Sequence, residues 1–186
     1  HQGIDAGIGE RLGHRVVVIE QPILAEAGVL VERVVAGQPF LDGDDARILI
    51  GTGDNRLIAL DARTGKPIPS FGVNGEVDLG VVGLQRPLLR DPIDLFACTS
   101  PPTICRDVVV IGQYIHDRVI AAEMPPGDVR GFDVRTGALK WTFHTVPMKG
   151  EVGWETWEDG SAARNGNANI WAPMAAWSKP ISSASS

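Results

Sequence analysis

Two stretches of the sequence, ALDARTGKPIPSF at residues 59–71 and GFDVRTGALKWTF at residues 131–143, have the same order of features. Each begins with an apolar segment, continues through Asp, Arg, Thr and Gly, and closes on an aromatic residue. Asp61 and Asp133, the aspartates of the two copies, are 72 positions apart. A repeat unit of that size cannot bury its apolar face alone, so neighbouring units are expected to stack on each other.

Each copy has the pattern of a β-hairpin. Apolar side chains alternate in the residues before the aspartate, which predicts a half-buried strand. The Arg-Thr-Gly sequence predicts a turn, because Gly65 and Gly137 can adopt positive φ. The expected strand pairings are 57–61 with 66–71 and 129–133 with 139–144.

A third strand is expected upstream in each unit. Residues 47–51 and 108–112 form short apolar runs, rich in β-branched residues and ending in Gly, as interior strands do. The second unit has about 11 more residues than the first after this strand, at roughly 113–127. An insertion between strands lies at one rim of a sheet, and polar side chains on a stiff loop there favour a binding site. A solvated surface loop is the alternative.

Composition agrees with an all-β protein. The chain has 186 residues, 44% of them hydrophobic, with 22 Gly and 13 Pro, which fits many short strands better than long helices. The net charge of −6 and the lack of a basic patch argue against a nucleic-acid partner. The apolar run at 16–19 is too short to cross a bilayer, and the N-terminal residues lack a signal-peptide pattern. Because the sequence starts at His1, we expect it to be a piece of a longer protein.

The two cysteines and one acidic cluster are further candidates for a covalent or metal-binding role. Cys98 and Cys105 flank a rigid Thr-Ser-Pro-Pro-Thr-Ile segment and either form a disulfide or remain buried thiols. A zinc site is disfavoured because no His stands at metal spacing from them. The acidic residues 42–45 lack the other ligands of a calcium loop, and they predict a hairpin turn.

Four segments in colinear order resemble one family over about residues 42–174. They are ARILIGTGDNRLIALDARTGKPIPSFGVNGEVDL (46–79), TSPPTI (99–104), GDVRGFDVRTGALKWTFHTVP (127–147) and ANIWAPM (168–174). Together they resemble the dehydrogenases that depend on pyrroloquinoline quinone (PQQ), in particular the membrane-bound quinoprotein glucose dehydrogenase branch.

The resemblance implies a fold and an activity. The family fold is an eight-bladed β-propeller, of which this chain would contain two to three four-stranded antiparallel blades. We expect an N-terminal segment at 1–38, propeller blades at 39–175 and an atypical tail at 176–186. Family members are periplasmic and oxidise sugars, polyols or alcohols, passing electrons to a quinone acceptor. Membrane association would come only through parts of the protein outside this sequence.

The resemblance also implies site residues. Trp171 takes the place of the family tryptophan that stacks on PQQ, for which an indole face offers a rigid apolar floor; filling the core is the alternative. Asp117, with His116 beside it, falls where the family has a ligand for Ca²⁺ or Mg²⁺, although the His-Asp pair departs from the family pattern. Thr99 and Ser100 are candidates for the cofactor rim. Arg130 is expected to be a packing or surface residue rather than a catalytic one.

Other family residues have no counterpart in this sequence. The catalytic carboxylate base and a second metal ligand follow the Trp-Ala-Pro segment in the family, and residues 175–186 do not supply them. We therefore expect the 186-residue chain to be inactive by itself and prone to aggregate through open sheet edges. The alternatives are a cofactor-free propeller scaffold and an inactive pseudo-enzyme.

Overall fold

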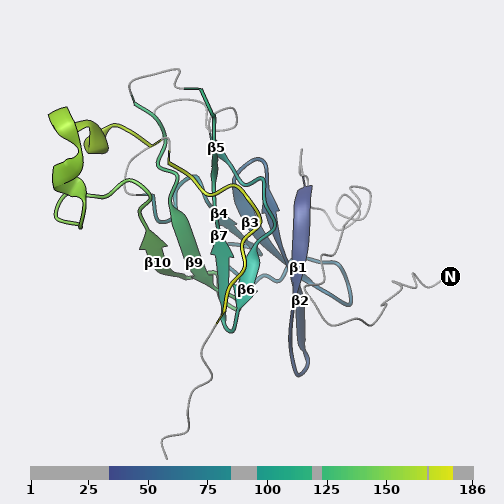
Figure 1. Ribbon diagram of the computed structural model, residues 1–186. Helices are drawn as coiled ribbons and strands as arrows, with labels where there is room; N and C mark the ends of the chain where they lie inside the picture. Colours follow the sequence, from purple (N-terminus) through teal and green to yellow (C-terminus); the bar gives the residue numbers. More distant parts are fainter. Residues whose placement is uncertain (1–33, 85–95, 119–122, 167, 178–186) are drawn as a thin grey trace, which may run out of the picture.

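Two four-stranded antiparallel sheets lie face to face in the computed structural model, which describes residues 34–84, 96–118, 123–166 and 168–177 (Figure 1). The first sheet has its strands in chain order: β1 (Val34–Asp42), β2 (Asp45–Thr52), β3 (Arg56–Asp61) and β4 (Glu76–Asp78). The second has the order β10-β9-β7-β6, from β6 (Thr103–Cys105), β7 (Val108–Ile111), β9 (Val129–Asp133) and β10 (Leu139–Phe143). The prediction of an all-β protein built from four-stranded antiparallel sheets is confirmed.

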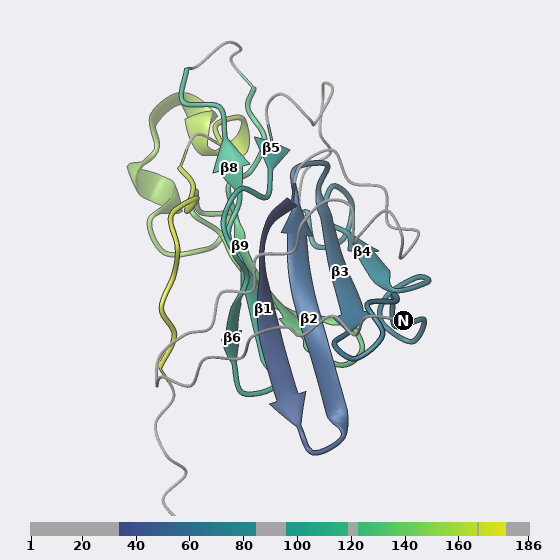
Figure 2. The ribbon, with the colours of Figure 1, turned by 90° about the vertical axis from the view of Figure 1, so that its right-hand side faces the viewer.

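The insertion lies between the second and third strands of the second sheet. There β8 (Tyr114–Ile115) pairs with β5 (Phe96–Ala97) in a separate two-stranded sheet, which Figure 2 shows beyond one end of the large sheets. Helix is confined, among the described residues, to the short 3₁₀ segments η1 (Trp154–Thr156) and η2 (Glu158–Ala163). None of the described helices is long and apolar enough to span a membrane. The expected division at residue 39 falls inside β1, and the three-part division of the chain stays a prediction.

One of the two predicted hairpin pairings is confirmed, and the other is confirmed only next to its turn. In the second unit β9 pairs with β10, with Gly131 opposite Trp141. In the first unit the backbone N–H of Asp61 donates to the oxygen of Lys66 and that of Ile68 to the oxygen of Ala59 (both 2.9 Å), on either side of a bridge between Leu60 and Pro67. Residues 56–58 of β3 pair instead with β4. The hairpin pairing goes no further, and the backbone N–H of Ala59 donates to the backbone oxygen of Gly75 (3.0 Å), just before β4.

The two turns are nevertheless built alike. In each, one carboxylate oxygen of the aspartate accepts hydrogen bonds from the backbone N–H groups two and three residues later. The donors are Arg63 and Thr64 for Asp61, and Arg135 and Thr136 for Asp133. The predicted hairpin turn at 42–45 is also confirmed, with Gly43 at positive φ between β1 and β2.

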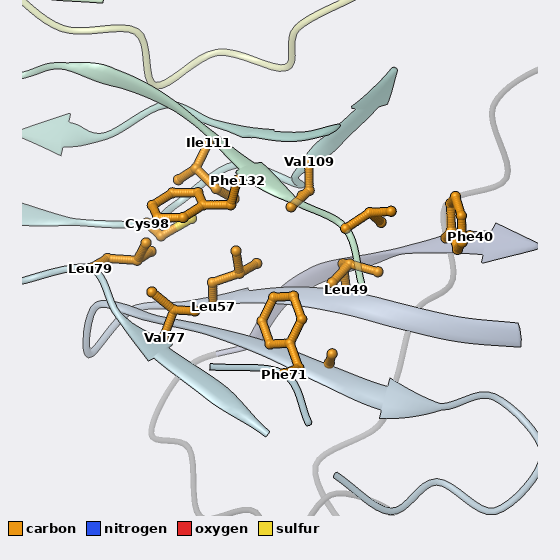
Figure 3. Packing of buried hydrophobic residues seen from close by; sticks show 12 residues of the cluster. Phe40, Leu49, Leu57, Phe71, Val77, Leu79, Cys98, Val109, Ile111 and Phe132 are labelled. Carbon is orange, nitrogen blue, oxygen red and sulfur yellow. The ribbon is translucent and has the colours of Figure 1, made fainter. Parts of the chain in front are cut away.

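The core lies between the two sheets (Figure 3). Leu49, Leu57 and Phe71 of the first unit pack with Val109 and Phe132 of the second, and all five are fully buried. A buried Leu or Phe contributes about 1.5–3 kcal/mol, so this shared interior holds the two units together. The stacking expected from the repeat is therefore confirmed.

Arginines add polar links between the sheets. Arg47 of β2 donates from Nη1 to the backbone oxygens of Val134 (3.1 Å) and Arg135 (2.9 Å) in the second unit's turn. Arg135 reaches back to pair with Asp42, and also pairs with Asp107. These contacts fix the second Arg-Thr-Gly turn against β2 and the β1–β2 turn of the first sheet.

The two cysteines do not form a disulfide. Both thiols are free; Cys98 is buried, and Cys105, at the end of β6, is half-buried. Burial raises the pKa of Cys98 to about 12, and its Sγ lies 3.6 Å from the backbone oxygen of Ser100. The thiol of Cys98 therefore stays protonated, which makes it a packing group.

Candidate cofactor-binding site

The segment that carries Trp171 runs along the second sheet and its insertion. Figure 1 shows it in yellow, passing in front of this sheet. Asn169 bridges to Gly127, and its side-chain amide donates to the backbone oxygen of Ile115 in β8 (3.2 Å). Further along, the Thr103 hydroxyl donates to the backbone oxygen of Met174 (3.0 Å). Segments that are 50 to 70 residues apart in the chain therefore meet at this sheet.

Two glycines make the contact close. A Cβ on Gly112 would lie 2.1 Å from the backbone oxygen of Ile170, and one on Gly127 would lie 2.2 Å from that of Ala168. Real Cβ atoms do not approach backbone atoms so closely, so these positions require Gly. The residues at both ends of the insertion thus hold the Trp171 segment directly against the backbone.

Trp171 keeps much of its surface open. The residue is 53% exposed, although Asn169, two residues before it, is hydrogen-bonded to the insertion. Trp171 therefore takes no part in the core between the two described sheets. An exposed indole on a fixed backbone fits the stacking of a planar ring.

His116 and Asp117 directly follow β8. Asp117 is exposed, and His116 is half-buried. The His116 Nδ1 accepts a hydrogen bond from the backbone N–H of Arg118 (3.1 Å). This bond occupies Nδ1 of His116, so Nε2 is the ring nitrogen that it leaves for another contact.

Thr99 and Ser100 lie one residue beyond the end of β5, the partner of β8. Thr99 is exposed and Ser100 is 6% exposed, so only Thr99 presents its hydroxyl to the surface. The β5–β8 pairing, with Ala97 opposite Tyr114, brings this segment beside the start of the insertion. The predicted site residues therefore lie just after β5, just after β8, or on the segment that is hydrogen-bonded to β8.

The described residues do not form a complete metal site. They contain no cluster of three or more His, Cys, Asp or Glu side chains that could hold an ion. Ca²⁺ binds about six to eight oxygen ligands, and Mg²⁺ binds about six. The chemistry of Asp117 suits such an ion as one ligand, and the exposed indole of Trp171 suits a planar ring.

A buried polar group supports β5. Arg130 was predicted to be a packing or surface residue. It lies in β9 and is fully buried, so it is a packing residue. Its Nη1 donates to the backbone oxygens of Leu79 (2.8 Å) and Val82. Its guanidinium carbon lies 5.9 Å from the ring centres of Phe96 and Phe132.

Sequence reasoning missed Asn55 and Gln113, which are 3% and 0% exposed. Asn55 stands in a Gly-Asp-Asn-Arg sequence that is typical of a turn, and Gln113 is the first residue after a Gly-terminated strand. The Asn55 amide donates to the backbone oxygen of Phe96 (2.7 Å). Neither residue type nor spacing signals such a long-range contact, because it depends on how the two sheets pack.

Comparison with known proteins agrees with this architecture. The family model of the PQQ glucose/ethanol/alcohol dehydrogenase β-propeller domain matches residues 19–179. The quinate/shikimate dehydrogenase (quinone) of Acinetobacter baylyi is 38% identical over 128 residues, which are 69% of this chain and 15% of that protein. Quinoprotein glucose dehydrogenase A of Acinetobacter calcoaceticus is 33% identical over 135 residues, covering 69% of this chain and 15% of that protein.

Among solved structures, a quinohaemoprotein alcohol dehydrogenase from Pseudomonas putida HK5 is 28% identical, with a TM-score of 0.42 over 63% of this chain and 13% of that one. The chain thus spans about one seventh of the length of such relatives. The family match extends over both sheets, the insertion and the Trp171 segment. This chain belongs to the PQQ-dependent glucose/ethanol/alcohol dehydrogenase β-propeller family.

Proposed function

We propose that this chain supplies one wall of the cofactor site in a longer PQQ-dependent dehydrogenase. The observation that carries the proposal is the exposed Trp171 indole on a backbone fastened to β8. The enzyme would oxidise a hydroxyl group of a sugar, polyol or alcohol in the periplasm and pass electrons to a quinone acceptor. The names of the relatives, which include quinate and glucose dehydrogenases, support this substrate class.

Each candidate residue would have a separate task. The Trp171 indole would stack on the plane of PQQ, and the Thr99 hydroxyl, with Ser100 behind it, would hydrogen-bond to its rim. Asp117, with His116 beside it, would give one ligand to Ca²⁺ or Mg²⁺. When bound, PQQ accepts the two electrons that are removed from the substrate's alcohol carbon.

The chain alone would lack parts of the machinery. A competent site also needs a general base to remove the hydroxyl proton and further ligands for the metal. No such cluster occurs within the described ranges, and the chain covers about 15% of each relative's length. Both facts support the proposal that residues 1–186 are a segment of the working enzyme.

A dye-linked dehydrogenase assay tests the proposal. The 186-residue chain and the complete open reading frame that contains it would each be given PQQ, Ca²⁺ or Mg²⁺, and glucose, quinate, glycerol or ethanol. We expect turnover by the complete protein with at least one substrate class and none by the chain alone. Turnover by the chain would show that it contains the base. A complete protein that neither binds PQQ nor turns over would favour the cofactor-free scaffold instead.

A further inference from the structure

The strand that leads to Thr99 and Ser100 is held by side chains from distant parts of the chain. β5 has only two residues, and a strand that short gains little from its own ladder. Both of its backbone oxygens accept hydrogen bonds from buried amides. Asn55 donates to Phe96 (2.7 Å), and Gln113 donates to Ala97 (3.1 Å) in the amide orientation that satisfies both of its neighbours.

Arg130 determines which way the Gln113 amide points. A guanidinium can only donate hydrogen bonds, and a backbone oxygen can only accept them. The Gln113 side chain lies between the two, so its oxygen faces Nη2 of Arg130 (2.7 Å) and its nitrogen faces Ala97. With the opposite orientation, the Gln113 nitrogen would face the Arg130 donor and the Gln113 oxygen would face the Ala97 acceptor. Neither pair could form a hydrogen bond, and the site is closed to solvent.

Arg130 is itself fixed in position. Two backbone oxygens and two aromatic rings surround its guanidinium, and its side chain is fully buried. Burial lowers the pKa of Arg130 to about 10, while Asp128 acts to raise it. The residue therefore stays cationic at neutral pH, and it cannot change its role as a donor.

The same group of contacts reaches the other candidate residues through β8. Phe96 and Ala97 pair with Ile115 and Tyr114. The backbone oxygen of Ile115 accepts the Asn169 amide, two residues before Trp171. A shift of β5 would therefore move β8 and the segment bonded to it.

We propose that Arg130 and Gln113 are positioning residues, which set β5 and β8 so that Thr99, Asp117 and Trp171 converge on one ligand. This inference rests on the proposed function, because the ligand is PQQ. The two side chains do not contact the cofactor; they act through the backbone of β5.

The Gln113→Glu substitution tests the inference in the complete protein. A carboxylate keeps the contact with Arg130 and gains charge assistance, so the melting temperature should change little. It cannot donate to Ala97, and two oxygens would then face each other. We expect PQQ to bind about tenfold more weakly, measured by quenching of tryptophan emission on titration. In the absence of PQQ, backbone hydrogen exchange at residues 96–100 should be faster in Gln113→Glu than in the wild type.

Arg47→Met is the matched control for Arg130→Met. Both arginines are buried and donate to two backbone oxygens across the sheets, but Arg47 binds the turn at Val134 and Arg135, away from β5. Both variants should melt at a lower temperature. Only Arg130→Met should weaken PQQ binding by the folded protein, by about tenfold or more, whereas Arg47→Met should stay within about twofold of the wild type.

The outcomes separate the two proposals. If wild-type protein fails to bind PQQ, the proposed function is wrong and this inference falls with it. If the wild type binds PQQ and Gln113→Glu binds it equally well, with unchanged exchange at residues 96–100, the positioning role alone is wrong. Equal losses of affinity in Arg130→Met and Arg47→Met would also overturn it, because the effect would then follow stability alone.

Discussion

Asp133 is the side chain around which the second Arg-Thr-Gly turn is organised. Burial acts to raise the pKa of its carboxyl group, but hydrogen bonds from Lys140 and from the backbone N–H groups of Thr136 and Arg135 outweigh burial. The net effect lowers the pKa from 3.8 to about 2. Folding therefore favours the ionised form of Asp133.

The sign of this shift predicts a pH dependence. A carboxyl group with a lowered folded pKa stabilises the protein above its unfolded pKa of 3.8, and this contribution is lost as the pH falls towards about 2. Asp133→Asn keeps an oxygen for the turn but loses the ion pair with Lys140 (3.0 Å). We expect the variant to melt at a lower temperature than the wild type at neutral pH, with the gap closing between about pH 4 and pH 2. A gap that stays constant from pH 7 to pH 2 would contradict this explanation.

At the residue scale, sequence patterns identified local structure but not burial across the sheets. The role of Asp61 and Asp133 in the turns follows from the Asp-x-Arg-Thr-Gly spacing, because all the partners lie within three positions. The depth of Arg130 and its contact with Gln113 could not be predicted, since they depend on segments up to 51 residues away. The cofactor-stacking role of Trp171 was predicted from a family resemblance, and the exposure of this residue could not be predicted from the adjacent sequence.

At the scale of elements, the two hairpins show how one sequence pattern fits two environments. Gly65 and Gly137 close the turns with nearly the same φ, +70° and +72°. The space around them differs. A Cβ on Gly65 would meet nothing within 4 Å, whereas one on Gly137 would lie 2.7 Å from Cγ2 of Val77 and 3.0 Å from the backbone nitrogen of Gly72.

This difference makes the two glycines a matched pair for mutagenesis. Gly65→Ala should cost about 1 kcal/mol of unfolding free energy, because alanine is strained at positive φ. Gly137→Ala should cost about 2–4 kcal/mol, because the new methyl group also pushes the second turn away from the first sheet. Urea unfolding of the two variants beside the wild type measures both values. Equal costs would show that the sheets are not packed at Gly137.

The fourth strand shows where the sequence pattern failed. The repeat predicts that the residues after both turns pair alike, but the first copy has Lys-Pro-Ile-Pro where the second has Ala-Leu-Lys-Trp. The first copy pairs only at residues 59–61 with 66–68, and β4 takes the place beside residues 56–58 of β3. Strand identity, turn position and the site of the insertion were predictable from periodicity, whereas the length of the first hairpin was not, because β4 competes for the same edge of β3.

At the scale of the whole molecule, equivalent aromatic residues of the two units have different surroundings. Phe71 is fully buried between the sheets, and Phe143, its counterpart 72 positions later, is 60% exposed. Phe143 and Trp141 lie opposite Val129 and Gly131 in the ladder, on the face of the second sheet away from the shared core. In the first unit, the second sheet covers the equivalent residue.

We therefore expect the isolated 186-residue chain to self-associate through this face. Two exposed aromatic rings at a sheet edge favour contact with another copy. Light scattering after size-exclusion chromatography should show a mass that rises with concentration, and Phe143→Lys should lower it. A wild-type chain that is monomeric at all concentrations and unfolds in one sharp thermal transition would contradict this expectation.

The central claim is that Trp171 forms the floor of the PQQ site, and a cofactor titration of the complete protein tests it most directly. Trp171→Ala would be compared with Trp177→Ala, which removes a neighbouring indole that is 77% exposed. Loss of the stacking face is worth on the order of 1 kcal/mol beyond buried area, so PQQ affinity should fall at least about fivefold in Trp171→Ala. It should stay at the wild-type value in Trp177→Ala. An unchanged dissociation constant for Trp171→Ala would show that the indole does not contact PQQ.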